Sequence, residues 1–71
     1  MKFAGTDISA GAVARLALRL EQAGETGLAH RVGIAVDTGH DMQLTNLDRK
    51  AVTRVLALSP GELREIRAAL R

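Results

Sequence analysis

The chain has 71 residues, Phe3 as its single aromatic residue, no cysteine and a formal net charge of +2 at neutral pH. This length predicts one domain, residues 1–71, which buries only about 60% of the surface that its unfolded chain exposes. The absence of cysteine excludes disulfides and thiolate metal sites, and the thin core of Leu, Val, Ile and Ala favours association with another chain as the remaining stabiliser.

Hydrophobic spacing and capping residues predict an all-α fold, a compact bundle of four short helices over about residues 9–23, 27–38, 46–57 and 60–70. Residues 1–8 are a short lead-in, and Phe3 is expected to pack on the bundle. The first helix begins at the N-cap Ser9 and ends near Gly24. Its core stripe comprises Val13, Leu16, Ala17 and Leu20.

Residues 28–39 decide between two architectures. As a helix, this segment is capped by Thr26, ends at Gly39 and has an apolar stripe of Leu28, Val32, Ala35 and Val36. As a strand, its β-branched residues alternate with small ones, and the chain becomes α+β with a hairpin at about 31–44. The spacing fits a helix, and a lone two-stranded hairpin needs a larger sheet, so we expect the helix.

The second half of the chain begins with a short extended connector over residues 40–46. Thr45 is expected to cap the third helix, with Asp48 at the third helical position. That helix is predicted to bury Leu47, Ala51, Val52 and Val55, with Arg49, Lys50 and Thr53 facing solvent. Ser59-Pro60-Gly61-Glu62 marks the start of the last helix, which is stapled by Leu58 and Leu63 and buries Leu63, Ile66 and Leu70.

The sequence carries no catalytic motif, no metal-ligand set and no phosphate-binding loop. Asp37, His40 and Asp41 fit a polar turn, and His30 fits a surface histidine on a polar face. Ser9 and Ser59 are best explained as helix caps. The sequence therefore predicts a protein that is not an enzyme, with no cofactor, no metal and no small-molecule substrate.

Two helices each carry a bulky aliphatic residue off their core stripe, which suggests a partner surface. Leu18 and Ala14 lie almost opposite the first stripe, and Ile34 points away from the second stripe, near His30. The leading hypothesis is a small helical interaction module that uses these four residues to bind itself or another protein. The chain has no apolar run that could span a bilayer, no signal-peptide core and an Arg- and Ala-rich composition, so we expect a bacterial, cytoplasmic protein with no membrane partner.

The alternative is a small DNA-binding or antitoxin-like regulator. The chain has four basic and six acidic residues up to Asp48, but six basic and two acidic residues from Arg49 onward. The nucleic-acid contacts would come from Arg49, Lys50, Arg64, Arg67 and Arg71.

A short motif in the same half of the chain bears on this alternative. Leu44-Thr45-x-x-Asp48-Arg49 with Ala51-Val52 and Glu65-Ile66 loosely resembles the start of the helix-turn-helix domain of LuxR-type regulators, over about a third of the chain. Two features depart from that pattern. The spacing to Glu65-Ile66 is too long, and no recognition helix follows it, so the chain is not identified as a member.

Overall fold

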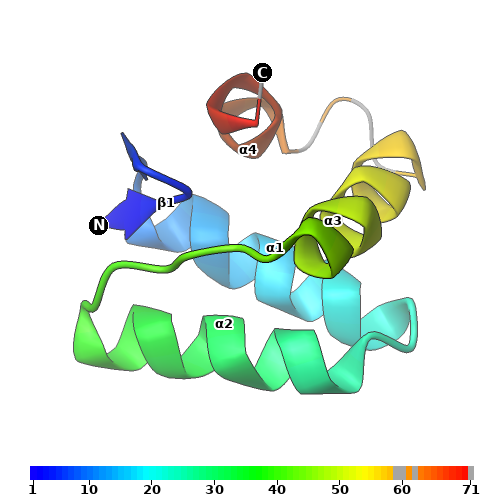
Figure 1. Cartoon of the computed structure of the whole chain (residues 1–71), viewed down its shortest axis with the longest axis horizontal. Coiled ribbons are helices and arrows are strands. Elements are labelled where there is room, and N and C mark those ends of the chain that lie inside the picture. Colours follow the sequence, from blue (N-terminus) through cyan, green and yellow to red (C-terminus); the bar gives the residue numbers. More distant parts are fainter. Residues whose placement is uncertain (59–60, 62, 71) are drawn as a thin grey trace.

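Two antiparallel helices form the base of the molecule. The computed structural model describes residues 1–58, 61 and 63–70. Within them, strands β1 (Lys2–Phe3) and β2 (Thr6–Asp7) precede α1 (Ala10–Gln22), α2 (Thr26–Thr38), α3 (Asn46–Leu58) and α4 (Arg64–Ala69). Helices α1 and α2 lie side by side, and α3, α4 and the strands lie on one side of this pair (Figure 1). The predicted four-helix fold is therefore confirmed.

Local sequence signals set the ends of α1 and α2. The Ser9 side chain accepts a hydrogen bond from the Ala12 N–H at 3.3 Å, as expected of an N-cap. Gly24 and Gly39 adopt positive φ values of 86° and 70° at the ends of the two helices. The predicted Thr26 cap is wrong: α2 begins at Thr26, and Glu25 occupies the cap position without a side-chain hydrogen bond. Because residues 26–38 are helical, the alternative hairpin at 31–44 is absent.

The N-terminal lead-in forms two short strands, which were not predicted from the sequence. Strands β1 and β2 pair antiparallel around a tight turn in which Ala4 and Gly5 both have positive φ, 52° and 85°. Met42 adds a parallel bridge to Phe3, with Met42 N–H donating to the Lys2 carbonyl at 3.0 Å. Phe3 is fully buried, as predicted, so this small sheet ties residues 1–8 and the 40–46 connector to the core.

Helix α3 buries most, but not all, of the apolar residues that its spacing predicts to be buried. Ala51, Val52 and Val55 are buried as expected, but Leu47 and Leu58 are 76% and 78% exposed. Both leucines stand near the ends of an apolar stripe whose middle alone is covered. The predictions of a buried Leu47 and of a Leu58–Leu63 staple are therefore wrong.

Smaller differences follow from the same packing. Asp48 and Leu56 are also buried on α3, although neither was predicted to be. Ala12 and Ala29 are more buried than Ala17 and Val36, which were predicted to lie in the core stripes. The last helix is observed from Arg64, with Leu63 at its N-cap and Ile66 in the core. The predicted capping residues Ser59, Pro60 and Glu62 lie outside the described residues.

The exposed area of the single chain is close to that of an average monomer of its mass. Its accessible surface is 4282 Å², and a monomeric protein of this mass is expected to expose about 4,290 Å². Among the described helices, none is both long and apolar enough to cross a membrane.

Candidate functional site

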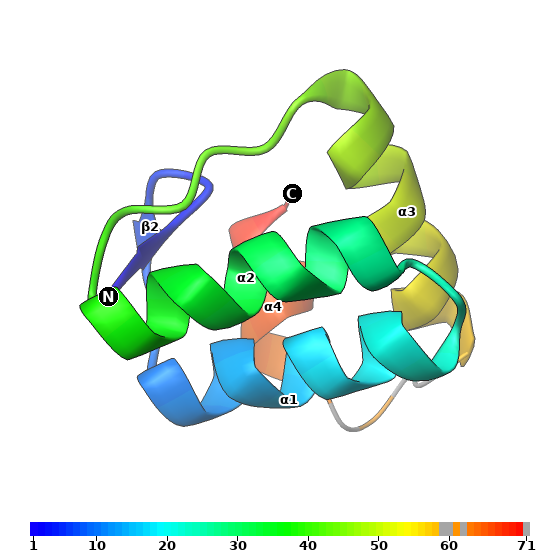
Figure 2. The same ribbon diagram turned by 90° about the horizontal axis from the view of Figure 1, so that it is seen from below.

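The first candidate surface, here named the α1–α2 face, contains the four residues predicted to bind a partner. Leu18 and Ile34 are 54% and 48% exposed, and Ala14 and His30 are exposed beside them. Helices α1 and α2 run antiparallel about the 23–25 turn (Figure 2). By helix geometry, Leu18 is therefore about level with His30, and Ala14 with Ile34. The two aliphatic residues are thus offset by about 6 Å along the helix axes, on helices about 8–10 Å apart.

This face is open to solvent and carries charges of both signs. In Figure 2, α1 and α2 lie in front, with α4 behind them. A shallow hollow of about 200 Å³ between the two helices is lined by Glu21, Thr26, Ala29 and His30. Arg15 and Asp37 are exposed on the same two helices. The arrangement offers an aliphatic patch with mixed charges around it.

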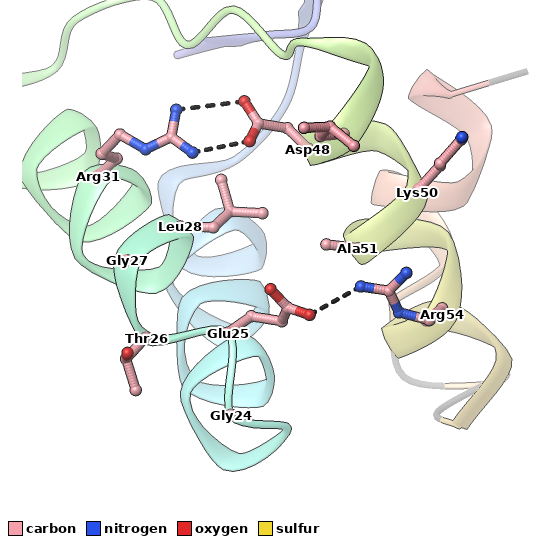
Figure 3. Close-up of a pocket in the computed structure, with 11 residues that line it drawn as sticks. Gly24, Glu25, Thr26, Gly27, Leu28, Arg31, Asp48, Lys50, Ala51 and Arg54 are labelled. Atoms are coloured by element: carbon pink, nitrogen blue, oxygen red, sulfur yellow. Dashed lines mark hydrogen bonds and ion pairs between the residues drawn. The ribbon is translucent and has the colours of Figure 1, made fainter.

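The second candidate surface lies where α3 meets the start of α2. Two ion pairs span a hollow of about 390 Å³ there: Arg31 to Asp48 at 2.7 Å and Arg54 to Glu25 at 2.8 Å (Figure 3). Leu28 and Ala51 are buried and lie between the two pairs. The hollow therefore has an apolar floor between two charged bridges.

Asp48 is the buried polar residue of this region, and its carboxylate is fully engaged. One oxygen accepts from the Thr45 backbone N–H at 3.1 Å, while the Thr45 hydroxyl accepts from the Asp48 N–H at 3.1 Å. This is the predicted capping arrangement. Two hydrogen bonds from Arg31 add to it and lower the pKa of the Asp48 carboxyl against the opposing effect of burial. The Arg31 partner was not predicted, since no local sequence signal pairs residues 17 positions apart.

A further hollow of about 230 Å³ continues along α3. It is lined by Val55 and Leu58 of α3 and by Arg19, Gln22 and Ala23 at the end of α1. The two exposed leucines therefore mark the two ends of one line on α3, with Lys50 and Arg54 between them. We call Leu47, Lys50, Arg54 and Leu58 the α3 edge. The α3 edge was not predicted, because an apolar stripe alone does not reveal which turns of the helix stay uncovered.

The predicted nucleic-acid residues do not form one continuous stripe. Arg49 and Lys50 are exposed on α3, but they point about 100° apart around that helix. Arg64 is exposed on α4, whereas Arg67 is partly buried and donates to the Leu56 carbonyl at 2.7 Å. Arg71 lies outside the described residues.

Of the polar residues considered for chemistry, Ser9 caps α1, and Ser59 lies outside the described residues. Asp37, His40 and Asp41 are exposed, and the described part of the chain contains no group of three or more His, Cys, Asp or Glu side chains that could hold a metal. Besides capping α1, the Ser9 hydroxyl donates to the Glu65 carboxylate at 3.2 Å, which links α1 to α4. Compared with known proteins, the chain matches no family model, no curated protein and no solved structure.

Proposed function

We propose that this protein is a small, non-enzymatic helical interaction module that self-associates through the α1–α2 face. The observation that carries the proposal is the exposure of two bulky aliphatic side chains, Leu18 and Ile34, on neighbouring helices. An exposed aliphatic residue is common on its own, but aliphatic residues that gather on one face mark contact surfaces.

A second copy is the partner that this face fits best. Two-fold pairing of an antiparallel helix pair brings each aliphatic patch against its own counterpart, as in most soluble homodimers. Arg15, Glu21 and Asp37 supply both signs of charge around the patch, so a copy can meet opposite charges. A standard interface of about 800 Å² per partner would use about a fifth of the 4282 Å² that the protein exposes.

The solution mass of the purified protein tests this proposal. Sedimentation equilibrium is expected to give twice the 7.6 kDa chain mass, and Leu18→Glu or Ile34→Glu is expected to return the protein to the single-chain mass. Leu47→Glu is the matched control, because Leu47 is exposed on α3, away from this face. A protein that stays monomeric up to about 1 mM would refute self-association.

DNA binding is a second candidate, supported by the excess of positive charge from Arg49 onward. Arg49, Lys50 and Arg64 are exposed and available for phosphate contacts. This candidate predicts a mobility shift of duplex DNA that weakens steeply with salt and with Arg64→Ala. No shift at low salt would exclude it.

A further inference from the structure

We propose that the α3 edge is a docking surface for an acidic amphipathic helix of another protein. The surface is distinct from the α1–α2 face and does not depend on self-association. Its apolar anchors are Leu47 and Leu58, the two most exposed large hydrophobic residues of the described chain.

The spacing of the α3 edge suits a helical partner. Leu47 and Leu58 are eleven residues apart on α3, so they point about 20° apart around the helix and lie about 16 Å apart along it. Lys50 and Arg54 fall within about 60° of Leu47 on the same side. A partner helix laid along this line can present side chains to both leucines over three turns.

Each leucine adjoins a hollow with an apolar floor. Leu47 lines the hollow of about 390 Å³ that is floored by Leu28 and Ala51. Leu58 lines the hollow of about 230 Å³ beside Val55 and Ala23. Both volumes are several times the roughly 30 Å³ of a water molecule, so each hollow has room for an aliphatic side chain. The partner would therefore carry one aliphatic residue for each hollow.

The charges along the groove select an acidic partner. Arg31, Lys50 and Arg54 line the larger hollow, against the carboxylates of Glu25 and Asp48. Each carboxylate is already ion-paired, Asp48 with Arg31 and Glu25 with Arg54. The lining is therefore net positive, and a partner with carboxylates between its two aliphatic anchors complements it.

The same charges disfavour a second copy of this chain as the occupant. If two α3 helices paired antiparallel with Leu47 against Leu58, Lys50 of one copy would lie within one turn of Arg54 of the other. Like charges at that separation repel. A phosphate backbone would satisfy the cations but would leave both leucines without an apolar partner. An acidic amphipathic helix satisfies both requirements.

A designed peptide tests the proposal directly. The probe is a fluorescein-labelled, Ala-rich helix with two leucines eleven residues apart and glutamates four and seven residues after the first leucine. Fluorescence anisotropy is expected to show saturable binding in the micromolar range, at least about tenfold weaker with Leu47→Ser or Lys50→Glu. A peptide with lysines in place of the glutamates is expected to bind at least about tenfold more weakly.

Control variants keep the outcome decisive. Leu47 is largely exposed, so Leu47→Ser should leave the helical circular dichroism unchanged, and Leu18→Ser should leave peptide affinity within about twofold. Absence of binding up to about 1 mM peptide would overturn the proposal, and so would a loss of peptide affinity with Leu18→Ser equal to that with Leu47→Ser. If duplex DNA binds more tightly than the peptide, and this binding depends on Lys50 but not on Leu47, the proposal is overturned in favour of a nucleic-acid surface. Self-association is read separately from the solution mass of Leu18→Glu.

Discussion

Replacing Asp48 by alanine tests the link between α2 and α3. The change removes the acceptor for the Thr45 N–H, which is worth about 1 kcal/mol as part of a helix cap. It also removes the ion pair to Arg31, whose side chain is 53% exposed, so water compensates for part of the loss and about 1 kcal/mol remains. The higher helix propensity of alanine returns a few tenths of a kcal/mol.

The expected net loss is about 1.5–2 kcal/mol of unfolding free energy at pH 7. A domain of 71 residues has a total of roughly 4–10 kcal/mol, so the loss is a large share. It corresponds to a fall in Tm of about 10 °C for a domain of this size. Because the chain has no Trp or Tyr, unfolding in urea is followed by the circular dichroism of its helices.

The pH dependence distinguishes a charged Asp48 from a merely well-packed one. The pKa of the Asp48 carboxyl is lowered in the folded protein, chiefly by the hydrogen bonds from Arg31, so the unfolded state takes up this proton first as the pH falls. The stabilisation is therefore complete above the unfolded pKa of about 4 and is lost as the pH falls through the lower folded value. The difference between the wild type and Asp48→Asn should shrink below about pH 4.

Three comparisons complete this test. Arg31→Ala removes only the ion pair and should lose about 1 kcal/mol, and the double variant should show coupling of about 1 kcal/mol. Asp41→Asn is the matched control, an exposed carboxylate that should change stability by less than about 0.5 kcal/mol. A loss below about 0.5 kcal/mol for Asp48→Ala at pH 7, or a difference that stays constant down to about pH 2, would refute the reasoning.

Three further predictions concern the core, the N-terminal turn and the exposed α3 edge. Phe3→Ala should cost about 3–5 kcal/mol because the ring is fully buried, and a helical dichroism unchanged in mild urea would contradict this. Ala4→Gly should raise the free energy of unfolding by about 0.5–1 kcal/mol, since Ala4 has a φ of 52°; a lower midpoint in urea would argue against strain there. Leu47→Ser should change stability by less than about 0.5 kcal/mol, whereas Leu16→Ala should cost about 2–5 kcal/mol; equal losses in urea titrations would be inconsistent with their burial.

Local signals in the sequence determined the helices and most of their ends. The Ser9 cap and the Thr45–Asp48 cap depend on hydrogen bonds within three residues, so the chain near each helix end specifies them. Gly24 and Gly39 supply the left-handed conformations that end two helices. The exposure of Leu18 and Ile34 was likewise predicted, because helical periodicity places each away from its core stripe.

Only the tertiary structure decided which apolar residues of α3 are covered and which distant residues meet. Periodicity places Leu47, Ala51, Val55 and Leu58 on one stripe, but only the turns that pack against other elements bury it. The Phe3–Met42 bridge and the Arg31–Asp48 pair join residues far apart in sequence, and no local preference encodes such contacts. Helix formation depends on hydrogen bonds a few residues apart, whereas the exposed surface depends on how complete helices pack.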